Sequence, residues 1–281
     1  ELLVFLVRKE LSVKYKNSVL GFVWSMLNPA LTLAVYYFVF QEVLKAGIPG
    51  FAIFLMSGLI VWNLFSSAVP GATAAIVANA GIVKKVAFPR EILALASIGA
   101  SLVFFGFQAV VLVLAMVAFG FRPAVEYLPL LVPAMVALLL FSAALAVFFS
   151  AVNVRFRDVQ HLLEVAFMAW FWATPIVYSY QTVARQLRAR HVLWLYFANP
   201  VTTIVLTFQR AIYAKVTVFT KGPVLTRGGS VSAGGNLPIL PTWGQLTYLR
   251  GLAVVIAVSA VLFVGALAVF GRLEGSFAED L

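Results

Sequence analysis

The sequence contains no cysteine, few charged residues and only two histidines. The absence of cysteine excludes disulfide bonds, thiolate metal sites and a cysteine nucleophile. Charged residues make up 11% of the 281 residues, whereas hydrophobic residues make up 63% and the mean hydropathy is +1.02. A soluble globular domain carries about 25% charged residues on average. The composition therefore places the chain in a lipid membrane and excludes disordered, collagen-like and disulfide-rich proteins.

Acidic residues are also scarce. The chain has 20 Lys and Arg residues but only 10 Asp and Glu residues, which gives a net charge of +10. Such an excess occurs in nucleic-acid-binding proteins, but membrane proteins also show it because Lys and Arg flank the cytoplasmic ends of their helices. None of the acidic residues lies in the middle of a long apolar run, which argues against a carrier with buried proton-binding groups. We interpret the charge as a membrane feature and expect no nucleic acid partner.

Motifs for catalysis are missing as well. His161 and His191 are far apart and do not have the HExxH spacing of zinc proteases. No GxSxG nucleophile elbow occurs, and the only two aspartates, Asp158 and Asp280, cannot form an Asp-x-Asp metal site. No lysine follows a glycine, so the GxxxxGK[ST] phosphate loop is absent. We expect no catalytic residue, no metal site and no ATPase site in this chain.

Long apolar runs dominate what is present. A transmembrane helix needs about 20 mostly apolar residues, and six stretches without Asp, Glu, Lys or Arg are long enough. The fifth is the shortest and contains Pro175. We predict an all-α integral membrane protein, a single transmembrane domain over 1–281, with spans at about 19–41, 51–77, 92–119, 128–150, 163–180 and 250–271.

The distribution of Lys and Arg predicts the orientation, because positive residues resist translocation. If the N-terminus is cytoplasmic, the short outside loops carry only Lys45 and Arg122. The inside segments then carry Arg8, Lys9, Lys14, Lys16, Lys84, Lys85, Arg90, Arg155, Arg157 and Arg272. We therefore expect both termini to be cytoplasmic.

Residues 1–18 have the pattern of an amphipathic helix rather than of a signal peptide. Leu3, Val4 and Val7 share one face, and Lys9 and Lys16 lie opposite. We expect a cytoplasmic interface helix that binds anionic lipid or contacts a cytoplasmic partner.

The extracytoplasmic segment 181–249 is too polar for an ordinary span. Within it, Asn199 and Pro200 predict a helix cap and first helical residue. They open a short helix over 201–214, and we expect re-entrant or interfacial helices in this region. The Gly, Ser, Thr and Pro residues from 222 to 241 predict a surface excursion without a core of its own.

The stretch AGIVKKVAFPRE at 80–91 combines a basic cluster with an exposed Phe88 and a stiffening Pro89. These features are typical of an element that docks a partner. Positive flanks around a turn would explain the lysines equally well, but they would not explain Phe88 and Pro89.

Five segments in order resemble the membrane subunit of type-2 ABC exporters for lipid-linked polysaccharides, the O-antigen, teichoic-acid and galactan exporters. They are LGFVWSMLNPALTLAVYYFVF (20–40), IVKKVAFPREILALAS (82–97), NVRFRDVQHLLEVAFMAWFWATPIVYS (153–179), ANPVTTIVLTFQRAIY (198–213) and EGSFAEDL (274–281). The stretch 215–243 looks longer than the usual link of that family. The resemblance implies a bacterial cytoplasmic-membrane permease that is not itself an enzyme.

By this resemblance, two copies pair as a homodimer over two nucleotide-binding ATPase subunits, which bind ATP and Mg. The cargo would be a polyprenyl-pyrophosphate-linked glycan. The loop after the second span would be the ATPase-coupling element, with Lys84, Lys85, Phe88, Pro89, Arg90 and Glu91.

Aromatic and basic side chains then become candidates for binding the cargo. Sugar rings stack on aromatic side chains, and the family places spans one and five at the pore, which selects Tyr36, Tyr37, Phe167, Trp170, Trp172 and Tyr178. Membrane interfaces alone would also explain any one of these residues. A pyrophosphate needs cations near the cytoplasmic surface, and the candidates are Arg8, Lys9, Lys14, Lys16, Arg155 and Arg157.

Three alternatives stay open at this stage. The cargo could be a drug, lipid or peptide, which predicts a pore with few aromatic and hydroxyl side chains. An integral-membrane glycosyl- or acyltransferase would be active without an ATPase, although no acid–base pair is evident. A membrane scaffold would tolerate changes in the loop at 83–91.

Because the phosphate loop is absent, we predict that the purified chain alone hydrolyses ATP no faster than background. A phosphate-release assay on the detergent-solubilised protein checks this, with and without Mg. Hydrolysis that persists in protein free of contaminating ATPases would contradict the prediction.

Overall fold

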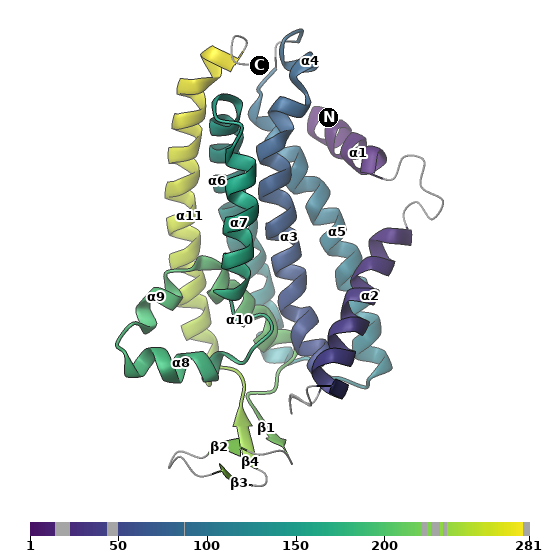
Figure 1. The fold of residues 1–281 in the computed structure, drawn as a ribbon, viewed down its shortest axis with the longest axis vertical. Helices are drawn as coiled ribbons and strands as arrows, with labels where there is room; N and C mark the ends of the chain where they lie inside the picture. The colour runs from purple at the N-terminus through teal and green to yellow at the C-terminus, as the bar shows by residue number, and fades with distance from the viewer. Residues whose placement is uncertain are drawn as a thin grey trace.

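The computed structural model describes residues 1–14, 23–43, 50–86, 88–220, 224–225, 231–232 and 235–277 (Figure 1). The α-helices are α1 (Leu2–Lys14), α2 (Trp24–Tyr37), α3 (Phe51–Ala78), α4 (Ala80–Val83), α5 (Glu91–Ala118), α6 (Leu131–Arg155), α7 (Val159–Trp172), α8 (Tyr180–Ala189), α9 (Leu193–Phe197), α10 (Pro200–Ile212) and α11 (Gln245–Leu273). A π-helix, η2 (Phe38–Val43), and two 3-10 helices, η3 (Val125–Leu130) and η4 (Glu274–Ser276), continue or precede them.

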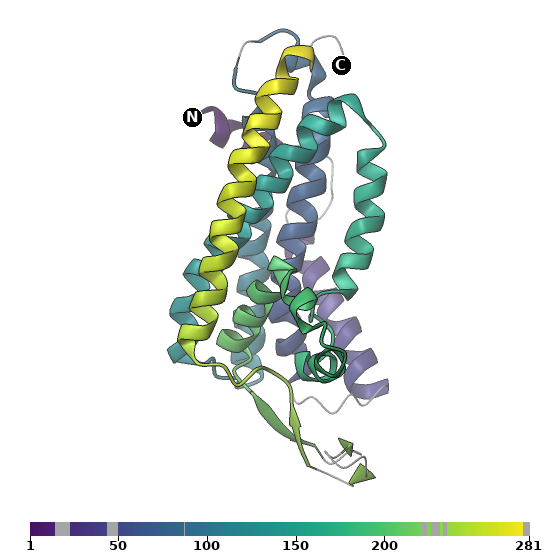
Figure 2. The ribbon, with the colours of Figure 1, turned by 90° about the vertical axis from the view of Figure 1, so that its left-hand side faces the viewer.

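The four longest helical segments form the bundle, and each is long and apolar enough to cross a membrane. They are α3, α5, α6 with its preceding η3, and α11. The α3 helix lies in the middle, and 83% of the residues in its most apolar stretch are buried. The α5 and α6 helices pack on it. The α11 helix packs along α6 (Figures 1 and 2). The expectation of a helical membrane protein is confirmed.

Two of the six predicted spans do not form long, straight α-helices. The predicted span at 19–41 corresponds to α2 followed by the π-helix η2, and residues 19–22 lie outside the described residues. The predicted span at 163–180 ends as an α-helix at Trp172. Pro175 explains the second departure, because proline lacks the N–H that a helix needs and disfavours helical backbone in the residue before it. Only four spans are therefore supported among the described residues.

The two ends of the bundle differ in what they carry. Both termini, α1 and α4 lie at one end, here called the terminal end, and the connection from α6 to α7 reaches the same end (Figures 1 and 2). The helices α8 and α9 and all four strands lie toward the other end.

The region before α11 contains four short strands that the sequence did not predict. Strand β1 (Thr217–Thr220) pairs antiparallel with β4 (Gly235–Pro238), and β2 (Val224–Leu225) pairs antiparallel with β3 (Val231–Ser232). They project from the bundle as a narrow extension (Figure 2). The predicted surface excursion thus has strand pairs, which adds a β element to the predicted all-α class.

The α10 helix begins as the sequence predicted. The Asn199 side-chain oxygen accepts a hydrogen bond from the Val201 N–H at 3.0 Å, and Pro200 is the first helical residue. Nearly all of α10 is buried against α3, α6 and α11. The cap prediction is confirmed.

The predicted helix at the N-terminus is present as α1, and the structure shows which of its side chains pack on the bundle. Leu6, with 6% of its surface exposed, faces the bundle, whereas Leu3 and Val4 are 41% and 54% exposed. The Val7 side chain approaches α5 where Gly99 leaves room for it: a Cβ there would lie 2.6 Å from Val7 Cγ2. The exposed Leu3 and Val4 remain available to lipid, as an interface helix requires, because lipid receives apolar side chains as readily as a protein core does.

Gly50 caps the N-terminus of α3 in a left-handed conformation with φ +67°. A Cβ on Gly50 would lie 2.6 Å from Phe121 Cε2, and stacking on Tyr213 at 5.4 Å holds the Phe121 ring in place. We predict that Gly50→Ala lowers the free energy of unfolding by about 2 kcal/mol, through backbone strain and overpacking.

Thermal unfolding in detergent measures this effect. Gly265→Ala is the matched control, since a Cβ on Gly265 in α11 would meet no atom within 4 Å. That substitution should be neutral or stabilising, because alanine is the better helix former. Equal melting temperatures for Gly50→Ala and the unaltered protein would contradict the prediction.

Candidate functional site

The main hydrophobic core of the bundle surrounds α3. A second hydrophobic core lies at the terminal end and joins elements that are far apart in the sequence. Its buried members come from α1, α3, α4, α5, α6, α11 and the segment after η4: Leu6, Ala75, Ile76, Val83, Leu93, Ala96, Val147, Ala151, Val154, Ala266, Phe270 and Phe277. Because six helices contribute, a displacement of one helix end at this position requires its neighbours to shift or repack.

The proposed docking loop contributes to this core. Lys84, Lys85 and Pro89 are exposed, as a docking surface requires. Phe88, however, is partly buried and packs against the second core. The expectation of an exposed Phe88 was wrong, because its apolar ring packs against the buried side chains of the second core.

Arg90 and Glu91 stand at the start of α5. Arg90 turns toward the C-terminal segment, where its Nη1 donates a hydrogen bond to the Glu274 carbonyl oxygen at 2.7 Å. Glu91 is the first residue of α5, a position where a carboxylate interacts favourably with the helix dipole. The loop therefore presents its two lysines outward and its arginine inward.

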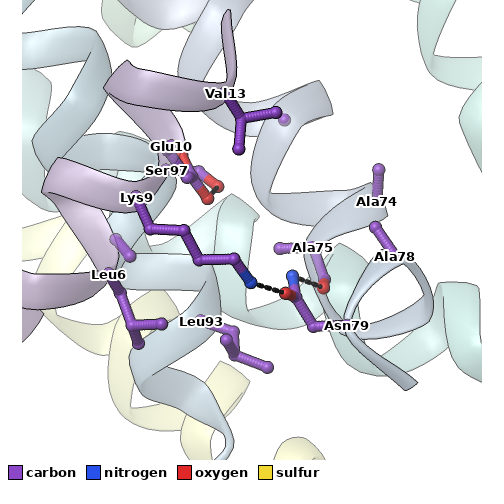
Figure 3. Close-up of a pocket in the computed structure, with 12 residues that line it drawn as sticks. Leu6, Lys9, Glu10, Val13, Ala74, Ala75, Ala78, Asn79, Leu93 and Ser97 are labelled. Carbon is purple, nitrogen blue, oxygen red and sulfur yellow. Dashed lines mark hydrogen bonds between the residues drawn. The ribbon is translucent and has the colours of Figure 1, made fainter. Parts of the chain in front are cut away.

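A cavity of about 420 Å³ lies between α1, α3 and α5, beside the contacts that join α1 to α5 (Figure 3). Apolar and small side chains form most of its wall, among them Leu6, Val13, Gly71, Ala74, Ala78 and Leu93. Lys9 reaches into it and donates a hydrogen bond from Nζ to Asn79 Oδ1 at 2.7 Å, and Asn79 in turn donates to the Ala75 carbonyl oxygen at 2.8 Å. The cavity thus combines an apolar wall with one ammonium group.

Glu10 lies on the α5 side of the same cavity. Ser97 Oγ donates a hydrogen bond to Glu10 Oε1 at 2.8 Å. Burial raises the pKa of the Glu10 carboxyl above its ordinary value of 4.5, although the hydrogen bond from Ser97 and the charge of Lys9 both act to lower the pKa. Desolvation of the carboxylate is therefore the larger effect at this position.

The six predicted head-group cations are not gathered in one place. Lys9 enters the cavity, whereas Arg8 is exposed on α1. Lys14 is the last residue of α1, and Lys16 lies outside the described residues. Arg155 and Arg157 are exposed at the connection between α6 and α7, toward the terminal end.

The six predicted glycan-channel aromatics fall into two groups. Tyr36 and Tyr37 lie on α2, where Tyr37 stacks on Phe119 with ring centroids 6.3 Å apart. The others belong to α7 and the bend after it: Phe167, Trp170, Trp172 and Tyr178.

Within the α7 group, packing and exposure differ strongly. Phe167 and Trp170 pack on Phe65 of α3 with centroids 5.0 and 5.1 Å apart, and Trp170 Nε1 donates to Asn199 Oδ1 at 2.9 Å. Trp172 is 62% exposed, and its carbonyl oxygen accepts a hydrogen bond from the Tyr178 hydroxyl at 3.0 Å. Of these side chains, Trp172 offers the most surface to a ligand.

A line of polar contacts between α3 and α5 was not among the features predicted from the sequence. Asn63 Nδ2 donates to Gln108 Oε1 at 2.8 Å, and Ser67 Oγ donates to Ser101 Oγ at 3.0 Å. The spacing of Ser97, Ser101 and Gln108 was the available signal, since residues four and seven apart share one helix face. Hydrogen bonds of this kind hold membrane helices together in the absence of a hydrophobic driving force.

The raised pKa of Glu10 gives a pH dependence with a definite sign. The folded protein binds the Glu10 proton more tightly than the unfolded chain does. The buried, charged carboxylate therefore lowers the stability of the fold above the raised pKa, and this destabilisation disappears as the pH falls toward 4.5. We predict that Glu10→Gln raises the melting temperature at pH 7.5 and has less effect near pH 4.5.

Melting curves in detergent across this pH range check the sign. Glu164→Gln is the control, because Glu164 is exposed on α7. A stabilisation by Glu10→Gln that is equally large at both pH values would contradict the assignment.

Comparison with known proteins places this arrangement in a family. Residues 1–213 match the model of the ABC-2 type transporter family, and the match ends shortly before β1. The chain is 30% identical over 209 residues to the O-antigen export system permease protein RfbA of Klebsiella pneumoniae, covering 74% of this chain and 79% of that protein.

Two further relatives are also named as export or transport proteins. An O-antigen export system permease protein RfbA of Myxococcus xanthus is 33% identical over 213 residues, covering 75% of this chain and 80% of that protein. The polysialic acid transport protein KpsM of Escherichia coli is 21% identical over 207 residues, covering 73% and 78%. The chain therefore belongs to the ABC-2 type transporter membrane family, with relatives that are O-antigen export permeases.

Proposed function

We propose that the chain is the permease subunit of an ATP-driven exporter that moves a polyprenyl-pyrophosphate-linked polysaccharide, an O-antigen or a galactan, across the bacterial cytoplasmic membrane. The similarity to permeases named for O-antigen export, over about three quarters of the chain, carries this proposal. The permease works as a homodimer with two ATPase subunits, which bind ATP and Mg. This chain contributes no catalytic residue.

The terminal end faces the cytoplasm and receives the ATPase. Its exposed Lys84, Lys85, Arg155, Arg157 and Arg272 support this orientation, because positive residues are retained on the cytoplasmic side. The exposed lysines and Pro89 form the docking surface. Closure of the ATPase dimer then pushes on a loop that packs into the second core, so the push reaches several helix ends at once.

The pyrophosphate head group binds at the same end. Lys9 supplies an ammonium group within the cavity, and the small residues Gly71, Ala74 and Ala78 leave room for the first part of the lipid chain. Arg8 and Lys14 on the same helix, and Arg155 and Arg157 across the terminal end, attract the anion electrostatically.

The glycan passes along a wall to which α2 and α7 contribute. Trp172 presents an exposed indole ring, and the Tyr178 hydroxyl is held against the Trp172 carbonyl. Phe167 and Trp170 fix the position of α7 in this wall by packing on Phe65 of α3. Tyr36 and Tyr37 contribute from α2.

Depletion of the protein in its native host tests the proposal. We predict that a polyprenyl-linked glycan accumulates on the cytoplasmic side, as measured by extraction of labelled lipid-linked sugars from sealed vesicles. If synthesis stops and nothing accumulates, the chain acts in synthesis and the export proposal is wrong.

Complementation of the depleted host distinguishes a residue that contacts the glycan from one that only stabilises the fold. Trp172→Ala should leave the amount of folded protein unchanged and slow export about two- to tenfold, the range expected when one aromatic contact is lost. Trp170→Ala, the matched control, should reduce the amount of folded protein, because Trp170 is packed and hydrogen-bonded to Asn199. Export by Trp172→Ala at the unaltered rate would remove Trp172 from the glycan path.

A further inference from the structure

The C-terminal segment is tied to the start of α5 through Arg90. Besides the 2.7 Å hydrogen bond to the Glu274 carbonyl oxygen, Arg90 Nε lies 3.7 Å from Glu274 Oε1. The guanidinium carbon also lies 5.8 Å from the centroid of the Phe277 ring. One side chain of the proposed ATPase-docking loop therefore contacts backbone, carboxylate and aromatic groups of the segment that follows α11.

Phe277 anchors this segment in the second core. It is 1% exposed, and its ring meets Phe270 of α11 edge-on with centroids 5.4 Å apart. The same core contains Val83 of α4 and Leu93 of α5, which flank the docking loop on both sides. The residues after α11 are thus packed between the docking loop and the bundle.

The Arg90 guanidinium suits the group that it contacts, the carbonyl end of α11. The last carbonyl groups of a helix have no partner within the helix, and they carry its negative dipole end. Arg90 supplies a positive donor to this end of α11, at the junction with η4. A lysine has no planar fork that could serve the carbonyl and the carboxylate together.

We propose that the segment Glu274–Phe277 is the second half of the coupling element, and that Arg90 is a positioning residue that locks the docking loop to the end of α11. This inference rests on the proposed function. A push on Lys84, Lys85 or Pro89 then moves the ends of α5 and α11 together, and α11 carries the movement to α6, on which it packs.

Two substitutions and one control test the proposal in the permease co-purified with its ATPase and reconstituted in vesicles. Arg90→Ala and Phe277→Ala should raise the ATP hydrolysed per glycan exported by at least about fivefold, the lower range of coupling between distant sites. Phe277 is decisive because a buried ring cannot contact the ATPase directly. Arg272→Ala, an exposed basic residue on the last turn of α11, should leave the ratio unchanged.

The absence of native cysteine from this chain allows a second measurement, whose first part needs no substitution in the second core. Spin labels on cysteines introduced at the exposed positions Gly81 and Arg272, outside the docking surface, report the distance between α4, which leads into the docking loop, and α11. In the otherwise unaltered complex this distance should be the same without nucleotide and with trapped ATP, and Phe277→Ala should make it differ between the two states.

The outcomes separate this inference from the proposed function. If the unaltered complex exports glycan but the distance between the labels changes with nucleotide, or Phe277→Ala keeps the normal ratio, the coupling role of the C-terminal segment is wrong. If the unaltered complex exports no glycan at all, the proposed function itself fails.

Discussion

The arrangement of the bundle depends on the burial of α3. In lipid, helices gain little from hiding apolar surface, because hydrocarbon tails are as apolar as leucine. Close approach and hydrogen bonding must hold them instead, and α3 has both along its length. Ser67 and Asn63 pair with α5, Asn153 of α6 donates to the Thr73 carbonyl oxygen at 3.0 Å, and Gly58 leaves room for the Gln209 side chain of α10.

The same need for satisfied polar groups shapes the break after α7. Pro175 interrupts the helix and frees backbone carbonyl groups inside the structure. Gln209 of α10 donates a hydrogen bond to the Pro175 carbonyl oxygen at 2.8 Å, and Asn199 donates to Thr174 Oγ1 at 3.0 Å. The bend is therefore supported by α10, which explains why a short helix with few charges is buried among long ones.

The two ends of the molecule are held by different contacts. At the terminal end, apolar residues of six helices meet in the second core, and this end also contains the cavity with Lys9. At the other end, rings of α8, α9 and α11 and the segment before α11 contact one another, namely Tyr180, Tyr196, Phe197, Trp243 and Tyr248. A change at the terminal end can thus reach the other end through the long helices between them.

Composition and spacing alone determined the membrane environment, the helical class, the positions of the four long helices and the Asn199 cap. These properties follow from local patterns: the length of apolar runs, and an Asn–Pro pair at a helix start. Candidate residues at both ends also followed from charge and aromatic content. Those signals carry no information on which side chains meet, so six aromatics that looked alike separated into packed and exposed groups.

Tertiary structure decided which face of α1 packs on the bundle, whether Phe88 is buried and which residue Arg90 contacts. In a membrane protein an apolar side chain is stable against lipid or protein, so amphipathic patterns do not identify the packed face. Leu6 rather than Leu3 faces the bundle, next to the position where Gly99 admits Val7. The contact between Arg90 and Glu274 joins residues 184 positions apart. No local pattern encodes such a pair, which exists only because α5 begins beside the end of α11.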